Sequence, residues 1–310
     1  MEIQTENGLK EVLKLLEEGN PIQAQVLISS LFEKDLGSME LTYANRCCTF
    51  WIDTNKRLKE LTNEHEYADR LLSEWKSFQL FLNKEKFVYE PALYSVQKGF
   101  FSTALKNYQK LFDETEPLRK AEILRNAGIC YKKLGNFDNA RNCLSEANQV
   151  YPHLASVLAE LADCYALCGE DKYSKVLFRE AFFTSAQDID LYYLDSELIN
   201  CLVSNVKEKG YTGKSLLQWI PVYGVLLGIF NIKRELTSHE FVRLRQNIYA
   251  MENEYKDPSC KTDILVPKLL NSYFWLIDHY MLKHESIQKI NEILLRIKIL
   301  DSSIYDLYIK

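Results

Sequence analysis

Apolar and polar residues follow one another with helical spacing along most of the chain. This pattern, with apolar positions about three to four residues apart, predicts helices over 39–62, 65–83, 237–255, 265–283 and 285–299. The chain holds only 11 glycines and 7 prolines among 310 residues. A β-rich fold needs turn residues about every 8–12 positions. The sequence therefore predicts an all-α protein of long helices joined by short turns.

A segment of 34 residues occurs twice in succession. When residues 121–154 are aligned with residues 155–188, seven positions are identical. These are Ala121/Ala155, Leu124/Leu158, Cys130/Cys164, Tyr131/Tyr165, Gly135/Gly169, Glu146/Glu180 and Ala147/Ala181. Gly135 stands where a left-handed residue would end the first helix, and Pro152 would stop the second. The period predicts tandem helical hairpins.

The residues that recur at this period resemble the tetratricopeptide repeat (TPR) motif. The first unit has Leu124, Ala127, Gly128, Tyr131, Gly135, Ala140, Leu144, Ala147 and Pro152 at the motif positions. Leu124 replaces the usual aromatic residue, and the second unit departs further at Ser174 and Ala186. Gly128 and Ala140 would let the two helices of a hairpin approach closely. The resemblance implies a TPR-type, right-handed superhelical solenoid of helical hairpins.

The same motif divides the chain into three expected parts. A third unit over 85–120 would precede 121–154 and 155–188, with Pro91 kinking or delaying its first helix. Its turn and second helix would be marked by Gly99, Phe101, Ala104, Tyr108 and Leu111. Residues 1–84 read as degenerate TPR-like helices with a turn at Gly19-Asn20-Pro21. Residues 189–310 read as a C-terminal helical cap, beginning with one helical face formed by Leu191, Leu194, Leu198 and Leu202.

The TPR resemblance also implies a concave groove lined by the first helix of each unit. The groove positions would be Tyr89, Leu93, Val96 and Gln97, then Arg125, Ile129, Lys132 and Lys133, and then Ala159 and Asp163. Such a groove runs from apolar through basic to mildly acidic. It predicts a protein or peptide partner that carries acidic residues and apolar anchors. Leu93 and Ile129 stand where a carboxylate clamp for chaperone tails would need asparagine, which argues against that class of partner.

The stretch 216–230 is unusually apolar. It holds 15 residues and is interrupted by Pro221, Gly224 and Gly228, so it is too short and too broken to span a bilayer. Packing in the interior is the main interpretation. The alternative is a second interaction patch around Trp219 and Tyr223, which would serve self-association or assembly into a larger complex.

The sequence has no complete phosphate-binding or zinc-binding motif, because the required residues do not occur at the required spacing. Residues 208–215 end like a phosphate-binding loop, but Glu208 occupies the position of its first glycine. No CxxC pair occurs, so we expect the cysteines, Cys164 and Cys168 included, to be buried thiols rather than zinc ligands. The sequence therefore predicts a non-enzymatic chain without cofactor or metal. An enzyme or small-molecule binder with a site assembled from distant residues is the remaining alternative.

The net charge and the first six residues bear on the expected class of partner and on the expected cell compartment. The net charge is −5 and no dense basic cluster occurs, which disfavours nucleic acid as a partner. Residues 1–6 have neither the basic region nor the apolar region of a secretory signal, so we expect a cytoplasmic protein. The leading hypothesis is a scaffold that binds a protein or peptide in its groove.

Overall fold

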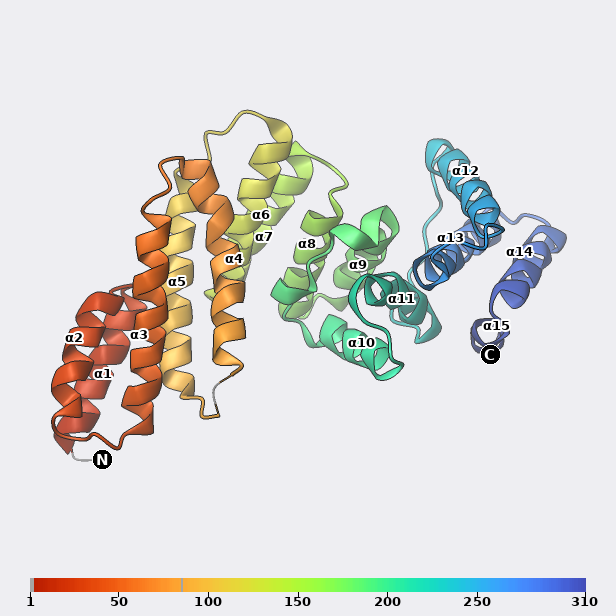
Figure 1. The fold of residues 1–310 in the computed structure, drawn as a ribbon. Helices are drawn as coiled ribbons and strands as arrows, with labels where there is room; N and C mark the ends of the chain where they lie inside the picture. The colour runs from red at the N-terminus through yellow and green to blue at the C-terminus, as the bar shows by residue number, and fades with distance from the viewer. Residues whose placement is uncertain (1–2, 85) are drawn as a thin grey trace. The chain divides into compact units, whose positions relative to one another are not determined.

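The computed structural model describes residues 3–84 and 86–310, and it is helical throughout (Figure 1). Helix accounts for 77% of it, and the described residues contain fifteen α-helices and no strand. The all-α prediction is confirmed. Residues 1–2, part of the segment examined for a signal, and residue 85, where the third unit was expected to begin, lie outside the described residues. The chain divides into two compact units, Met1–Tyr151 (unit 1) and Pro152–Lys310 (unit 2).

Unit 1 consists of seven helices. They are α1 (Ile3–Glu17), α2 (Pro21–Phe32), α3 (Met39–Leu58), α4 (Glu64–Leu82), α5 (Glu90–Gln109), α6 (Pro117–Lys133) and α7 (Phe137–Val150). Helix α1 packs against α2 and α5, and α3 also packs against α2, α4 and α5. Buried aromatic rings fill the space between α3, α4 and α5, with Trp75 in contact with both Trp51 and Phe100.

Local capping explains where several of these helices begin and end. The Ser38 hydroxyl accepts a hydrogen bond from the Leu41 amide at 3.2 Å, and Asn63 accepts from the amides of His65 and Glu66. Both residue types are preferred caps because they satisfy amides that the first turn leaves unpaired. Gly19 has φ +76°, which ends α1 in the left-handed conformation before Pro21 opens α2. The helices predicted over 39–62 and 65–83 are confirmed as α3 and α4, within a few residues.

The expected hairpin over 85–120 is not formed, because residues 90–109 are one helix and α6 begins at Pro117. Helix α5 runs without a break through Gly99, so the predicted turn at that residue is wrong. A Cβ built on Gly99 would lie 2.0 Å from the Leu16 carbonyl oxygen. Gly99 is therefore required for the close approach of α5 to the end of α1, and not for a turn. Pro91 stands in the first turn of α5, where proline is tolerated, so it delays the helix and does not kink it.

Unit 2 consists of eight helices and two short 3₁₀ turns. They are α8 (Ala155–Leu167), α9 (Asp171–Ser185), η1 (Ala186–Asp188), η2 (Leu191–Tyr193), α10 (Glu197–Glu208), α11 (Gly213–Leu226), α12 (Ser238–Glu254), α13 (Thr262–Leu282), α14 (Ile287–Leu300) and α15 (Ser302–Tyr308). The three helices predicted near the C-terminus are confirmed as α12, α13 and α14. The single helical face expected from Leu191 to Leu202 is wrong, because Leu191 and Leu194 precede α10.

Each 34-residue segment contains a helical hairpin within its own unit. Helices α6 and α7 pair in unit 1, and helices α8 and α9 pair in unit 2. Gly135 and Gly169 end the first helix of each pair with φ of +76° and +78°. A Cβ built on Gly128 would lie 2.7 Å from Leu144 Cγ and 3.4 Å from the Ala140 carbonyl oxygen. The absence of a side chain at Gly128 is thus what lets α6 and α7 pack closely.

An ionic cluster in unit 2 fixes the extended segment 231–236 between α11 and α12. Asp278 on α13 pairs with the buried Arg179 guanidinium and, at 2.7 Å, with Lys233 Nζ. Arg179 also donates to the Ile232 carbonyl at 2.7 Å. Arg234 Nη2 lies 2.7 Å from carboxylate oxygens of both Glu180 and Glu240. Because every one of these charges has an opposite partner, the cluster is structural.

Candidate functional site

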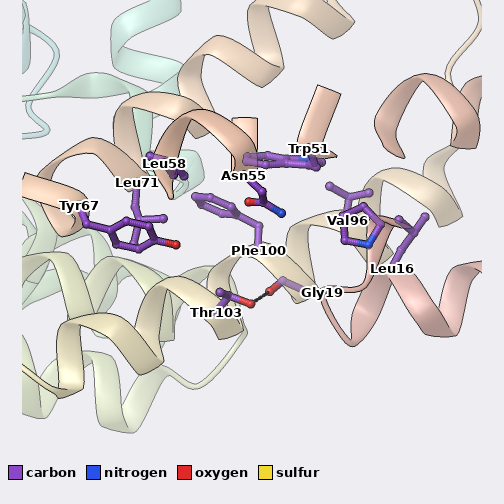
Figure 2. A pocket seen from close by; sticks show the side chains of 12 residues that line it. Leu16, Gly19, Trp51, Asn55, Leu58, Tyr67, Leu71, Val96, Phe100 and Thr103 are labelled. Atoms are coloured by element: carbon purple, nitrogen blue, oxygen red, sulfur yellow. Dashed lines mark hydrogen bonds between the residues drawn. The ribbon is translucent and has the colours of Figure 1, made fainter. Parts of the chain in front are cut away.

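An open and mainly apolar pocket lies in unit 1, where the α1–α2 turn meets α3, α4 and α5 (Figure 2). Its volume is about 60 Å³. It is lined by Leu16, Gly19, Pro21, Trp51, Asn55, Leu58, Tyr67, Leu71, Val96, Gly99, Phe100 and Thr103. Because side chains from α1, α2, α3, α4 and α5 meet around it, we take it as the candidate binding site.

Aromatic rings and closely packed backbone give the pocket its walls. The rings of Trp51 and Phe100 lie 4.8 Å apart between centroids, and Trp75 stacks behind Phe100 at 5.1 Å. On the opposite side, Gly99 brings α5 against the last turn of α1. Large rings supported by other rings hold their positions, because interiors are packed as densely as organic crystals. The walls are therefore formed before any ligand arrives.

Two polar side chains in the pocket are available to a ligand. The Asn55 amide and the Tyr67 hydroxyl are half-buried, and neither has a hydrogen-bond partner among the described residues. Figure 2 shows both beside the Phe100 ring. The Thr103 hydroxyl donates to the Gly99 carbonyl at 2.9 Å, and its oxygen can still accept a bond. Burial raises the pKa of Tyr67, which keeps its hydroxyl a neutral donor at physiological pH.

The pocket is small and its lining is chemically simple. A cavity of roughly 150 Å³ accommodates benzene, so this smaller one matches a single aliphatic side chain. No carboxylate, imidazole or thiol belongs to its lining. The pocket thus offers apolar walls and the hydrogen-bonding side chains of Asn55, Tyr67 and Thr103.

The structure places one predicted groove residue, Val96, in this pocket. Tyr89 and Leu93 are half-buried at the start of α5. Gln97 donates to the Lys133 backbone carbonyl at 3.1 Å, which ties α5 to the end of α6. These side chains follow one helix, but only Val96 contributes to the enclosed space.

The predicted basic strip on α6 is not an exposed surface. Ile129 and Lys132 are only 1% and 3% exposed, so neither is presented to a partner. Arg125 is half-buried, and its guanidinium donates to the Asn126 side-chain oxygen at 3.1 Å. The middle of α6 is buried around most of its circumference, whereas the motif positions alone suggested one open face. This corrects the groove expected at Arg125, Ile129 and Lys132.

The predicted groove residues in unit 2 have structural positions. Ala159 is 1% exposed on α8. Asp163 is fully buried and accepts hydrogen bonds from the backbone amides of Asp195 and Ser196, at 2.9 and 2.8 Å. It therefore anchors the chain where α10 begins, and a ligand has no access to it.

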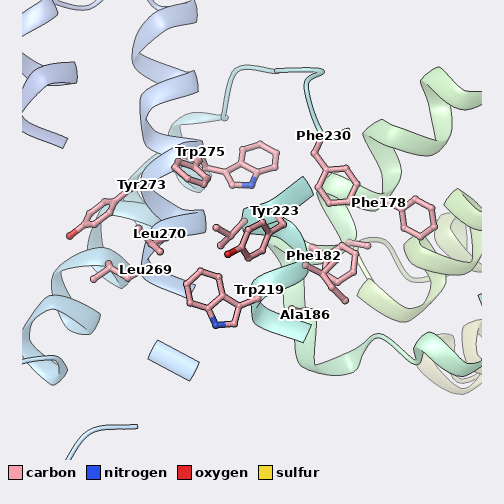
Figure 3. Packing of buried hydrophobic residues seen from close by; sticks show 14 of the residues in the cluster. Phe178, Phe182, Ala186, Trp219, Tyr223, Phe230, Leu269, Leu270, Tyr273 and Trp275 are labelled. Carbon is pink, nitrogen blue, oxygen red and sulfur yellow. The ribbon is translucent and has the colours of Figure 1, made fainter. Parts of the chain in front are cut away.

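Most of the apolar stretch 216–230 lies in the interior of unit 2, although Leu227 is 49% exposed (Figure 3). Trp219 and Tyr223 are 5% and 7% exposed, so the alternative of a surface patch there is corrected. Trp219 stacks on Tyr211 with centroids 4.5 Å apart. The ring of Phe230 folds back against Gly224, where a Cβ would lie 2.3 Å from Phe230 Cδ2. Gly224, which seemed to interrupt a helix, thus leaves the space that the Phe230 ring occupies.

In the described residues, the remaining sequence motifs do not form a phosphate-binding loop or a metal site. The segment 208–215 connects α10 to α11, and a phosphate-binding loop would follow a strand. Within the described residues, no three His, Cys, Asp or Glu side chains converge where they could hold a metal ion. Cys47, Cys48, Cys130 and Cys164 are buried, and burial raises the pKa of the Cys48 thiol to about 12. Cys168 and Cys201 are exposed, so the expectation that all the cysteines are buried is wrong.

No helix in the described part of the chain combines the length and apolarity that crossing a bilayer demands.

Comparison with known proteins adds no identification. No protein-family model matches the chain, and no curated protein shows a significant match to it.

Proposed function

We propose that this chain is a non-enzymatic helical-repeat scaffold of the TPR type that binds a segment of a partner protein. In this proposal the pocket of unit 1 receives one apolar side chain of that segment. Asn55 and Tyr67 then bind the polar backbone on either side of it.

The paired hairpins support the repeat assignment. Helices α6–α7 and α8–α9 come from two segments with seven identities at a spacing of 34 residues. Both hairpins turn at a glycine with positive φ, and Gly128 packs against Leu144 at the place where that family has a small residue. Helical repeats are commonly binding surfaces, because stacked hairpins present many side chains on one rigid framework.

The availability of the Asn55 amide and the Tyr67 hydroxyl is the observation that carries the binding proposal. A polar group beside an apolar wall loses hydrogen bonds to water when a ligand covers it, unless the ligand replaces them. A peptide segment can do so, because every residue brings a backbone N–H and C=O next to its side chain. An apolar anchor in the pocket therefore places backbone groups within reach of Asn55 and Tyr67.

Selection from a displayed library of random peptides tests this proposal on the full chain. We expect enriched peptides to share one aliphatic or small aromatic residue. Asn55→Leu keeps the volume of the side chain and removes the amide, and Tyr67→Phe removes only the hydroxyl. Each should weaken binding of a selected peptide about tenfold, since one lost hydrogen bond leaves a partner group unpaired.

Matched variants outside the pocket provide the control. Tyr94 lies on α5, is 63% exposed and does not line the pocket. Asn142 is exposed on α7. Tyr94→Phe and Asn142→Leu should leave affinity unchanged. Peptides without a shared anchor, or equal affinity for pocket and control variants, would rule the proposal out.

A further inference from the structure

One histidine of unit 2 contacts the last residue of the extended segment 231–236. His279 on α13 is 7% exposed, and its Nδ1 accepts a hydrogen bond from the Leu236 backbone amide at 3.2 Å. Leu236 is buried and immediately precedes Thr237, the residue that caps α12. The imidazole ring also stacks on Phe241 of α12, with centroids 4.6 Å apart. His279 therefore joins the start of α12 to α13 through both a ring nitrogen and a ring face.

The hydrogen bond to Leu236 requires the neutral imidazole. A ring nitrogen that accepts a bond from an amide carries no proton, so the hydrogen of neutral His279 is on Nε2. A protonated ring carries a hydrogen on both nitrogens, and its Nδ1–H would then face the Leu236 N–H. Two donors form no hydrogen bond, and the buried amide would lose its partner. Protonation of His279 and its bond to Leu236 therefore exclude each other.

The surroundings of the ring favour the neutral form. Burial of the imidazole is the largest effect, and Lys283, one turn farther along α13, acts in the same direction. Glu235 in the segment 231–236 and Glu285 after α13 act in the opposite direction. The net result is that the pKa of His279 lies below its ordinary value of 6.5.

No carboxylate near the ring is free to compensate for a new positive charge among the described residues. Both have a lysine partner, in the pairs Glu235–Lys283 and Glu285–Lys289. On α12, Arg245 adds another cation over the Phe241 ring, 5.8 Å from its centroid. His284, just after α13, also interacts with Glu235. A protonated His279 would therefore lose the amide of Leu236 without gaining an unpaired counter-ion.

The other described anchors of the segment do not change charge near neutral pH. Arg179 and Lys233 pair with Asp278, and Arg234 pairs with two glutamates. Ordinary carboxyl groups titrate near pH 4, and lysine and arginine lose their protons only far above pH 7. Histidine is the side chain whose ordinary pKa lies between these ranges. A change from neutral to mildly acidic pH therefore acts on the segment through His279.

We propose that the bond between His279 and Leu236 is a pH-sensitive contact, formed at neutral pH and released in mild acid. In the released state the imidazole is protonated, and the Leu236 amide exchanges with water. Arg179 and Arg234 still hold the preceding residues, so the opening is confined to the end of the segment and the first turn of α12. This inference does not depend on the peptide pocket proposed in unit 1.

The direction of the pH dependence follows from the neutral ring of the closed state. The open state binds a proton near pH 6.5, and the closed state binds it only at lower pH. The contact thus stabilises the closed state fully above pH 6.5 and loses this contribution as the pH falls below that value. Because the open state binds one more proton, the opening equilibrium rises by up to about tenfold for each pH unit in this range.

Hydrogen exchange of the full chain at about pH 7.5 and about pH 5.5, corrected for the pH dependence of the intrinsic exchange rate, measures this opening. Protection of peptides that contain Leu236 should fall severalfold, by up to about tenfold, whereas α10 peptides keep theirs. His279→Asn keeps an acceptor for the amide and removes the titration, so its protection should not depend on pH. His284→Asn is the matched control. His284 is exposed with φ 52°, a conformation that asparagine tolerates, so this variant should keep the wild-type pH dependence.

Wild-type protection that is equal at both pH values overturns the proposal. So does a pH dependence that persists in His279→Asn, or one that His284→Asn abolishes. If His279→Asn does not fold, NMR titration of the wild-type histidines decides the question. The pKa of His279 should then be lower than that of His284, and the Leu236 amide resonance should shift as His279 is protonated. A pKa equal to that of His284, or a Leu236 amide that does not respond, contradicts the pH-sensitive contact.

Discussion

The Cα of Gly99 lies so close to the Leu16 carbonyl oxygen that a side-chain carbon at position 99 would stand 2.0 Å from it. This contact joins the end of α1 to the middle of α5. Both residues line the candidate pocket. The distance between these two helices therefore sets the shape of one pocket wall, and it depends on a single residue without a side chain.

Gly99→Ala should destabilise unit 1 strongly. The neighbouring atom belongs to the backbone, so it cannot rotate away, and we expect a loss of about 3 kcal/mol, at the upper end of overpacking costs. Gly37→Ala is the control, since its Cβ would come no closer than 3.9 Å to Asp35. Chemical denaturation followed by circular dichroism measures both. Equal stability of the two variants would mean that α1 and α5 are farther apart than described.

Gly128→Leu should destabilise the α6–α7 hairpin by about 1–3 kcal/mol, because the new side chain must displace Leu144. Ala140→Leu, on the facing helix, should behave alike, because Ala140 is fully buried. Glu146→Leu adds the same side chain at an exposed position of α7 and should change the free energy of unfolding by less than about 0.5 kcal/mol. If Gly128→Leu and Ala140→Leu melted at the wild-type temperature, this packing would be contradicted.

The sequence predicts a structural feature where the cause of that feature is local. Gly135 and Gly169 end helices because their left-handed conformation is easily reached only by glycine, and that signal is visible in the chain itself. The same residue type at Gly99 was misread as a turn, because its role depends on Leu16, 83 positions away in sequence. Helical periodicity likewise located α3, α4 and α12–α14, but it wrongly placed Leu191 and Leu194 on the same helix as Leu198 and Leu202.

The candidate site could not be predicted in this way. Trp51, Asn55, Tyr67 and Phe100 come from three helices with no common spacing, so no motif in the sequence joins them. The TPR motif positions predicted that Ile129 and Lys132 lie on an open face of α6. Both side chains are in fact buried. Which face of a helix is covered is decided by the helices around it, and a repeat motif does not encode that fully.

Asp278→Asn should destabilise unit 2 by about 3–5 kcal/mol, because Arg179 would remain buried without its counter-charge. Glu235→Gln is the matched change. It removes a carboxylate from the pair with Lys283, in which both side chains are 49% exposed. Exposed ion pairs contribute little to stability, so little should change. Hydrogen exchange of α9 and α13 peptides reports the difference, and similar protection in both variants would show that the cluster is not structural.

Acid should selectively weaken the contact between Arg234 and Glu240. The hydrogen bond from Arg234, with further bonds from Thr237, lowers the pKa of Glu240 to about 2. A carboxyl whose pKa is lower in the folded state stabilises the fold above its unfolded pKa, near 4.5, and loses that contribution as pH falls toward 2. Glu240→Gln keeps the capping geometry at Thr237 and removes the charge.

The stability difference between wild type and Glu240→Gln should reach at most about 3 kcal/mol near neutral pH. It should shrink steadily between about pH 5 and pH 2, as the wild-type carboxyl gains its proton. Denaturation at a series of pH values measures it. A difference that does not depend on pH would show that the charge on Glu240 does not stabilise unit 2.

Methyl NMR of the full chain with a selected peptide tests the central claim most directly, because it locates the peptide. If the unit 1 pocket holds the anchor, the methyl resonances of Val96, Leu58 and Leu71 should shift as peptide is added. Those of Leu244 and Ile248, in the core of unit 2, should stay in place. Peptide-dependent shifts confined to unit 2, with Val96 unmoved, would contradict the proposed binding site.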